Sequence, residues 1–148
     1  MRYVLGFMFS PDGKRVALLT KKPGSPQENK LNGIGGKVEP AKDESLVAAQ
    51  VREFREETGV ETSWAFWREV GTFQGEGYEV TVFSGRVQTP ELPELVSPPD
   101  GEPVGWHATD MVQYLALRGA PEVASNLAWL LPLALDPNVA GASVRLHD

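Results

Sequence analysis

Three glutamates, Glu53, Glu56 and Glu57, stand three and four residues apart in the segment REFREETG. In a helix, residues at this spacing are neighbours, so the three carboxylates are expected to share one face. The expected core stripe falls on another face and consists of Val47, Val51, Phe54 and Thr58. Gly59 follows at a position where a left-handed residue typically ends a helix. The segment is therefore predicted to be an amphipathic helix with one acidic face.

An acidic face of this kind has two interpretations. Clustered carboxylates repel one another, and a hard cation such as Mg²⁺ would offset the repulsion, because it binds carboxylates together with substrate phosphates. Alternatively, the face is solvated and paired with Arg52 and Arg55. The preceding segment NGIGGKV, residues 32–38, favours the metal, because its glycines allow the backbone to approach a ligand closely.

Residues 52–60 read R-E-U-x-E-E-x-G-U, where U is a bulky aliphatic or aromatic residue. This pattern resembles the C-terminal half of the Nudix box at every fixed position. Gly36 resembles the opening glycine of the box, and seven residues separate Glu44 from Arg52, as in the family. The box then spans residues 36–60 with a two-residue insertion, because seven residues also separate Gly36 from Glu44.

The Nudix resemblance implies a metal site that holds Mg²⁺ or Mn²⁺. The implied ligands are Glu53, Glu56 and Glu57, with the carbonyl group of Gly36 as a further ligand. The resemblance also implies that Arg52 orients a box glutamate through a charge-assisted hydrogen bond. Arg52 and the three glutamates are therefore the candidate catalytic residues.

The identity of the general base stays open, because some family members use a box glutamate and others use a carboxylate from a later loop. Glu53 is the first candidate, Glu102 is the second, and Glu76 and Glu79 follow. Each of the three later glutamates has the alternative interpretation of ordinary surface charge.

The segment NGIGGKV further resembles the lead-in of Nudix enzymes that remove oxidised purine nucleoside triphosphates. In those enzymes the asparagine contacts the base, so Asn32 is a candidate substrate-binding residue, with an Asn-Gly turn as the alternative. Lys37 is a candidate phosphate contact or a solvated lysine. The segment NLAWLLP resembles one that lines the base pocket of such enzymes. Asn126 then reads a base edge, while Trp129 either walls the pocket or packs in the core.

The resemblance implies water attack on a phosphoanhydride bond. The leading prediction is a pyrophosphohydrolase that converts a nucleoside or deoxynucleoside triphosphate into the monophosphate and pyrophosphate, with oxidised dGTP as the specific hypothesis. Hydrolysis of ADP-ribose or of a dinucleoside polyphosphate is the first alternative. Tyr78 is the residue that supports a dinucleoside polyphosphate as the substrate. The proline that is common in ADP-ribose enzymes is absent from residues 75–77. A catalytically silent nucleotide sensor and a structural Ca²⁺ site are further alternatives.

Length and composition limit the class of protein. The 148 residues predict one domain, 1–148, and the chain has no cysteine. A formal net charge of −6 argues against binding to a nucleic acid duplex, and no apolar run is long enough to predict a membrane span. We expect a cytoplasmic monomer or homodimer with a small-molecule nucleotide substrate. His107 and His147 are predicted to be structural.

The remaining pattern predicts an α/β fold in which helices sandwich a mixed sheet. The Nudix resemblance independently implies an α/β/α sandwich. The predicted strands are Arg2–Ser10, Arg15–Thr20, Ser63–Phe73, Tyr78–Val87 and Val104–His107. Two further helices are predicted, one from Thr109 or Asp110 to Leu117 and one over Glu122–Leu135. Residues 21–31 are predicted to form a mobile loop at the edge of the site, and residues 136–148 carry no prediction.

Overall fold

The computed structural model describes residues 1–145. The elements in chain order are β1 (Arg2–Phe9), β2 (Arg15–Thr20), β3 (Leu31–Asn32), β4 (Ile34–Lys37), α1 (Leu46–Thr58), the 3₁₀ helix η1 (Trp64–Phe66), β5 (Arg68–Gly75), β6 (Tyr78–Arg86), β7 (Val104–Ala108), α2 (Thr109–Leu117), α3 (Leu127–Leu135) and β8 (Ala142–Arg145). Within this part of the chain, every helix is too short or too polar to cross a membrane.

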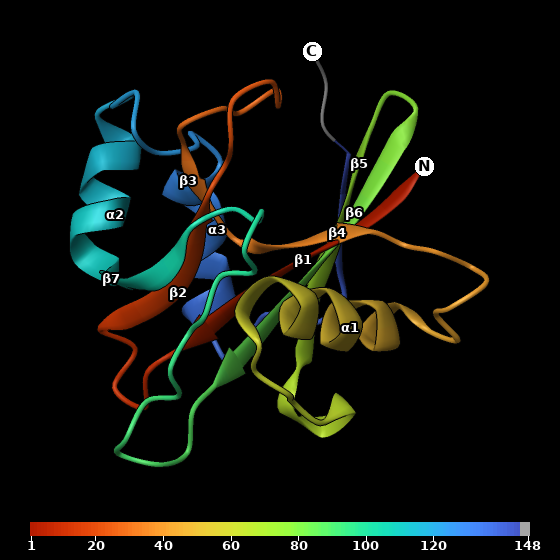
Figure 1. The fold of residues 1–148 in the computed structure, drawn as a ribbon. Coiled ribbons are helices and arrows are strands. Elements are labelled where there is room, and N and C mark those ends of the chain that lie inside the picture. Colours follow the sequence, from red (N-terminus) through yellow and green to blue (C-terminus); the bar gives the residue numbers. More distant parts are fainter. Residues whose placement is uncertain (146–148) are drawn as a thin grey trace.

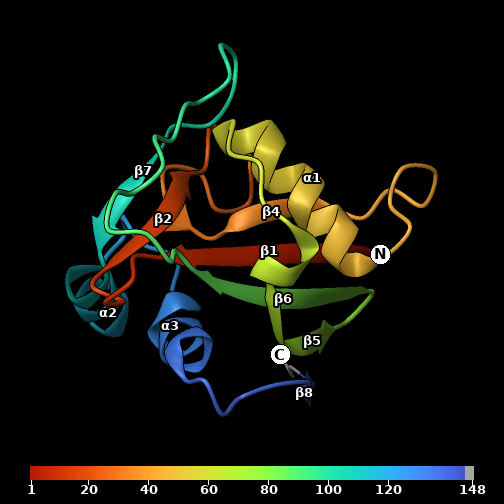
Figure 2. The same cartoon turned by 90° about the horizontal axis from the view of Figure 1, so that it is seen from below.

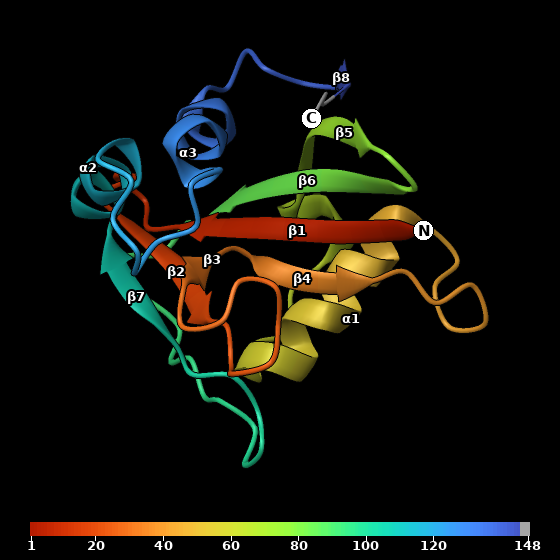
Figure 3. The same ribbon diagram turned by 90° about the horizontal axis from the view of Figure 1, so that it is seen from above.

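The strands form one mixed sheet, which Figure 1 shows with its helices. The hydrogen-bonded order is β3-β2-β1-β6-β5-β8, with β4 also paired to β1 and β7 paired to β2. β1 runs parallel to β6 and antiparallel to β2. The views from below and above place α1 on one side of β1 and β6 and α3 on the other (Figure 2 and Figure 3). The predicted α/β/α sandwich with a mixed sheet is confirmed.

Alternate side chains of β1 enter two separate cores, because successive side chains of a strand point to opposite faces of the sheet. Val4 and Met8 belong to the core beneath α1, together with Phe54 of that helix. Phe7 belongs to the core on the other face, together with Leu127 of α3. Burial on both faces explains why β1 reads as a nearly continuous apolar run.

The glycine-rich lead-in forms strands instead of a loop. β4 pairs antiparallel with β1, so that Ile34 lies opposite Gly6 and Lys37 lies opposite Tyr3. A Cβ atom on Gly35 would lie 1.9 Å from the carbonyl oxygen of Val4. The close backbone approach expected from the glycines therefore occurs at Gly35, and the group approached there is β1.

Helix α1 begins and ends as its sequence suggests. The Ser45 hydroxyl group accepts a hydrogen bond from the Ala48 N–H, and Gly59 ends the helix with a φ of 74°. The buried stripe differs from the prediction, since Ala49 and Gln50 are fully buried while Val47 and Val51 are half-buried.

The predicted strand Ser63–Phe73 begins later than expected. The Ser63 hydroxyl accepts a hydrogen bond from the Phe66 N–H and caps η1, so β5 starts only at Arg68. Trp67 turns inward and packs against Phe54 with ring centroids 5.1 Å apart. The alternating aromatic residues reflect this packing and do not mark a continuous strand.

The C-terminal region differs in two further respects. The helix predicted over Glu122–Leu135 begins at Leu127, because Glu122 and Ala124 exchange backbone hydrogen bonds with Leu31 of β3. Pro132 lies inside α3 without ending it. β8 then runs parallel to β5 as a sheet edge that no sequence pattern indicated.

Candidate functional site

Arg52 lies at the centre of a group of carboxylates. Its Nε and one terminal nitrogen donate to the two carboxylate oxygens of Asp43, at 2.7 and 2.8 Å. The other terminal nitrogen donates to Glu53 at 3.1 Å and to Glu56 at 3.2 Å. The guanidinium group also donates to the carbonyl oxygen of Lys37 at 3.2 Å. One planar side chain thus fixes α1, β4 and the intervening loop relative to one another.

The acidic face of α1 consists of Glu53, Glu56 and Glu57, and Glu53 is its most buried member. Gly36 of β4 lies directly against Glu53, because a Cβ atom there would come within 2.6 Å of both carboxylate oxygens. Burial raises the pKa of Glu53, while the positive charge of Arg52 opposes this shift. A buried carboxylate therefore adjoins the main chain at the opening glycine of the box.

Glu102 reaches the acidic face from the loop that precedes β7. The backbone N–H of Lys22 donates to its carboxylate at 2.9 Å, and the Lys21 ammonium group lies 3.9 Å away. Burial raises the pKa of Glu57, and the negative charge of Glu102 raises it further. A fourth carboxylate, distant in sequence, thus acts electrostatically on Glu57.

Asp43 is the residue of this cluster that sequence reasoning missed. Its side chain is 1% exposed, whereas Glu44, which has the family spacing to Arg52, is exposed to solvent. The hydrogen bond from Arg52 lowers the pKa of Asp43 despite its burial. The loop also closes on itself, because the Glu39 N–H donates to the Asp43 carboxylate at 2.8 Å. In the sequence, the turn-forming residues Pro40 and Asp43 indicate this closed loop.

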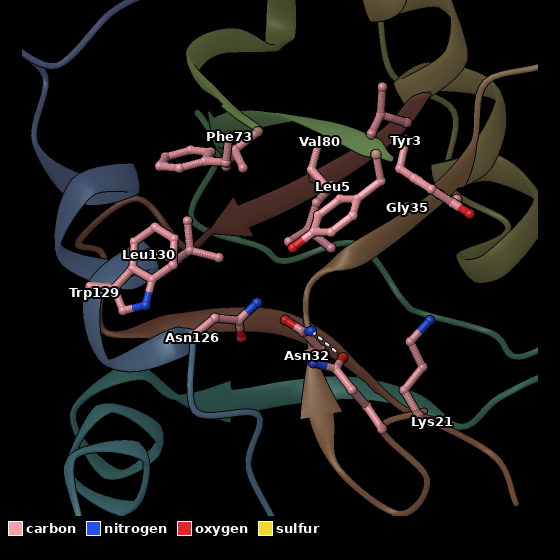
Figure 4. A pocket seen from close by; sticks show the side chains of 15 residues that line it. Tyr3, Leu5, Lys21, Asn32, Gly35, Phe73, Val80, Asn126, Trp129 and Leu130 are labelled. Atoms are coloured by element: carbon pink, nitrogen blue, oxygen red, sulfur yellow. Dashed lines mark hydrogen bonds between the residues drawn. The ribbon is translucent and has the colours of Figure 1, made fainter. Parts of the chain in front are cut away.

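A pocket of about 370 Å³, which we call the α3 pocket, lies between the sheet and α3. Figure 4 shows an apolar wall from β1, β5, β6 and α3, and polar side chains across from it. Its lining includes Tyr3, Leu5, Phe73, Tyr78, Val80, Trp129 and Leu130, with the polar side chains of Lys21, Gln27, Asn32 and Asn126. Gly35 and Gly36 of β4 complete it at the border with the acidic face.

Asn32 and Asn126, the two asparagines predicted to bind substrate, both line the α3 pocket. Asn32 is 4% exposed; its oxygen accepts from the Gly33 N–H at 2.8 Å and its nitrogen donates to Gln27 at 2.7 Å. The Asn126 side-chain oxygen is buried and has no hydrogen-bond partner among residues 1–145. Figure 4 shows the Asn126 amide directed into the pocket.

Trp129 forms a wall of the α3 pocket. Its side chain is 38% exposed and packs against Phe73 with ring centroids 5.1 Å apart. The core positions of α3 are instead occupied by Leu127, Leu130 and Leu131. Of the two interpretations of Trp129, the structure therefore places it at the pocket.

Some candidate residues lie apart from this cluster. The side chain of Lys37 is exposed, and only its carbonyl group contacts Arg52. Glu76 lies in the turn between β5 and β6 and Glu79 lies on β6, and neither forms an ion pair with another of the described residues. His107 is half-buried on β7, where burial lowers its pKa, and His147 lies outside the described residues.

Within residues 1–145, no three acidic, histidine or cysteine side chains lie close enough together to hold a metal ion. In the arrangement described, Arg52 contacts two of the three carboxylates of the acidic face.

Comparison with known proteins identifies the family. A family model described as the NUDIX domain matches residues 1–130, most of the chain. The chain belongs to the Nudix family. A search of curated proteins finds no significant match.

Solved structures share the Nudix fold at low sequence identity. A MutT protein from Bacillus halodurans has a TM-score of 0.67 and 20% identity, covering 97% of this chain and 88% of its own. The NUDIX domain of Shewanella oneidensis NrtR, solved with ADP-ribose, has a TM-score of 0.70 and 17% identity, covering 90% and 85%. A bifunctional NMN adenylyltransferase/ADP-ribose pyrophosphatase from Francisella tularensis, solved with AMP and a manganese ion, has a TM-score of 0.71 and 17% identity, covering 90% and 40%.

Family membership confirms the predicted Nudix identity, and with it the predicted class of pyrophosphohydrolase. The similar structures include both MutT and ADP-ribose proteins, so the comparisons leave the substrate open.

Proposed function

We propose that this Nudix protein hydrolyses a nucleoside or deoxynucleoside triphosphate to the monophosphate and pyrophosphate, with oxidised dGTP as the specific substrate. The observation that carries the proposal is the continuity of the α3 pocket with the acidic face of α1, because Gly36 belongs to both. A base bound in the pocket would direct its phosphates past Gly36 toward Glu53. The pocket volume of about 370 Å³ is within the usual range for small-molecule sites.

The residues around Gly36 suit a hard divalent cation, Mg²⁺ or Mn²⁺. Every available donor is an oxygen, and the absence of a side chain on Gly36 lets the Glu53 carboxylate lie directly against the main chain. We assign Glu53, Glu56, Glu57 and the Gly36 carbonyl group as the ligands. When bound, the cation would neutralise phosphate charge and make a coordinated water more acidic.

The protein then contributes orientation and proton transfer. Arg52, locked by Asp43, holds Glu53 and Glu56 in fixed positions. Water attacks a phosphorus atom, the bond to the pyrophosphate oxygen breaks, and a carboxylate accepts the proton of the water. Glu53 is the first candidate for this base, because it is the carboxylate of the acidic face that lies directly against Gly36.

Glu102 is the second candidate for the base, because it reaches the acidic face from a separate loop. Lys37 follows Gly36 at the end of β4, and we assign its exposed ammonium group to the leaving phosphates.

The amide groups in the α3 pocket support an oxidised guanine. One amide offers a donor beside an acceptor, so it pairs twice with a purine edge that also offers one of each. Guanine presents two acceptors on its major-groove edge, O6 and N7, and therefore pairs poorly with one amide. Oxidation at C8 places a hydrogen on N7 and creates the complementary edge. Asn126, whose side-chain amide is directed into the pocket, is the amide that we assign to this edge.

Adenine also offers one donor and one acceptor on this edge, so adenine nucleotides remain the second candidate. This alternative includes ADP-ribose and a dinucleoside polyphosphate. Tyr78 lines the α3 pocket and is 41% exposed, which places an aromatic side chain where a second base or ribose could stack.

The test is product analysis with a panel of nucleotides in the presence of Mg²⁺, with and without EDTA. The panel contains the common triphosphates, oxidised dGTP, ADP-ribose and a dinucleoside polyphosphate. We expect EDTA-sensitive release of pyrophosphate, fastest from oxidised dGTP. Turnover of ADP-ribose or the dinucleotide alone would overturn the triphosphate assignment, and nucleotide binding without turnover would indicate a sensor.

A further inference from the structure

Gln27 belongs to the loop that joins β2 to β3, and this loop is folded back by its own hydrogen bonds. The Lys21 N–H donates to the Lys30 carbonyl group at 2.9 Å, and the Asn29 N–H donates to the Lys21 carbonyl at 2.6 Å. Asn29 adopts a φ of 62°, a left-handed conformation that asparagine tolerates. These contacts turn the half-buried side chain of Gln27 toward the α3 pocket, which it lines.

Gln27 holds the amide of Asn32 in one orientation. Its side-chain oxygen accepts from the Asn32 nitrogen at 2.7 Å, while the Asn32 oxygen accepts from the Gly33 N–H at 2.8 Å. Rotating the Asn32 amide by half a turn would break both hydrogen bonds. The orientation of the Asn32 amide at the pocket is thereby fixed before any ligand binds.

The other end of the Gln27 amide is available to a ligand. Its nitrogen carries two N–H groups, and neither donates to another residue within 1–145. A ligand that fills the pocket removes this nitrogen from water, so a base without a matching acceptor leaves a donor unpaired. Such a mismatch discriminates more strongly than a change in apolar contact does.

We propose that Gln27 is a specificity-determining residue that donates to an acceptor atom of a purine base while it holds the Asn32 amide in one orientation. The inference rests on the proposed nucleotide-binding role of the α3 pocket, and it assigns the β2–β3 loop as a second source of base selectivity besides α3.

Two substitutions separate the contact with the base from the support of Asn32. In Gln27→Glu, a carboxylate oxygen still accepts from Asn32, but no donor faces the base. In Gln27→Leu, both contacts are lost. Asn29→Asp is the matched control, because it adds the same negative charge to the same loop at an exposed position.

The experiment is calorimetric titration with deoxynucleoside monophosphates of guanine, 8-oxoguanine, adenine and hypoxanthine. We expect wild-type protein to bind one base more tightly than the others. In both Gln27 variants, the ratio of affinities between that base and the others should fall roughly five- to tenfold. The control should keep the wild-type ratio within about twofold, and thermal unfolding should confirm that all variants are folded. Unchanged base ratios in both Gln27 variants, or equal binding of all bases by the wild type, would overturn the proposal.

Because monophosphates are not hydrolysed to pyrophosphate, this result is independent of the proposed reaction. Selective triphosphate hydrolysis with unchanged ratios in the Gln27 variants would overturn the role of Gln27 and keep the reaction. Loss of selectivity in the variants of a protein that hydrolyses no triphosphate would support Gln27 and overturn the reaction.

Discussion

At the scale of single residues, the site depends on the arginine that precedes the glutamates. Arg52 donates to carboxylates on its own helix and to a buried carboxylate in the loop before it. Without Asp43, the guanidinium group of Arg52 would contact only the carboxylates of the acidic face. The positions of the guanidinium group and of those carboxylates would then be less well defined. The Asp43–Arg52 pair therefore supports the geometry of the acidic face from behind.

Replacing Asp43 with asparagine should weaken both the fold and the proposed reaction. The substitution removes the charge of Asp43 and one of two short hydrogen bonds to Arg52, and breaking a buried ion pair in this way typically costs about 3–5 kcal/mol. Urea denaturation should show this decrease in the free energy of unfolding. Glu44→Gln is the control, because Glu44 is exposed. If Glu44→Gln had the larger effect, the family spacing would be the better guide and the assignment of Asp43 would be wrong.

The lowered pKa of Asp43 also predicts a dependence of stability on pH. A carboxylate whose pKa is lower in the folded state contributes stability above its unfolded pKa of about 3.9, and this is lost as the pH falls through the folded value. Glu53 and Glu57 have raised pKa values and act in the opposite direction as they take up protons. The difference between wild type and Asp43→Asn should therefore shrink below about pH 4. A difference that is constant from pH 7 to pH 2 would contradict the shift.

Sequence reasoning located the acidic face because it depends on local spacing alone. The three glutamates, Arg52 and Gly36 are brought together by one helix and the strand before it. Sequence reasoning missed Asp43 because the family spacing to Arg52 points to Glu44, whereas the closed loop at residues 39–43 brings Asp43 to Arg52. Sequence reasoning also missed Gln27 and the orientation of Asn32, because both depend on how the β2–β3 loop folds back. No periodicity in the sequence encodes that loop conformation.

At the scale of elements, α3 positions Asn126 and Trp129, and its C-terminal end is held by the sheet. Arg68 of β5 and Ser84 of β6 both donate to the carbonyl group of Ala134, at 3.0 and 2.7 Å. Carbonyl groups in the last turn of a helix lack partners within the helix, so these side chains stabilise that end. They hold the end of α3 that follows Pro132.

Substituting Arg68 with methionine should loosen α3 and with it the α3 pocket. We expect KM for the triphosphate to rise about three- to tenfold while kcat changes less than about twofold, because the residue lies far from the reacting bond in the proposed site. Steady-state kinetics measures both constants. Arg86→Met is a suitable control, since Arg86 is an exposed arginine at the end of β6. An equal fall in kcat would show that Arg68 acts on the acidic face instead.

The pairing of β4 with β1 sets the position of Gly36 relative to α1. Gly35→Ala would place a Cβ atom 1.9 Å from the Val4 carbonyl oxygen, so the two strands would have to separate. We expect a loss of about 1–3 kcal/mol of stability, measured by denaturation. Gly105→Ala in β7 is the control, because its nearest neighbour would be 3.8 Å away. Equal stability of the two variants would contradict the tight β1–β4 contact.

The sequence predicted the order of elements better than their limits. β1, β2 and β6 were found because each is an apolar or alternating run between turn residues. α3 and β5 start later than expected because tertiary contacts, between Leu31 and the segment 122–124 and between Trp67 and Phe54, replace local pattern. β8 is exposed at the edge of the sheet and carries no buried stripe that would mark it.

At the scale of the whole molecule, the sheet separates two cores and β4 forms the border between two halves of the site. The acidic face belongs to the α1 side, and the apolar wall of the α3 pocket belongs to the other. A nucleotide that occupies both would have its base against α3 and its phosphates against α1. This division explains how one fold can keep a constant reaction centre while its base pocket varies.

The most direct test of this account compares pyrophosphate release by the wild type and Glu57→Gln, with oxidised dGTP, Mg²⁺ and saturating substrate. Glu61→Gln is the control, because Glu61 is an exposed glutamate just past the end of the same helix. We predict that Glu57→Gln lowers kcat by roughly 100-fold or more with an unchanged unfolding midpoint, and that Glu61→Gln resembles the wild type. Comparable rates for wild type and Glu57→Gln would contradict the assignment of the acidic face as the reaction centre.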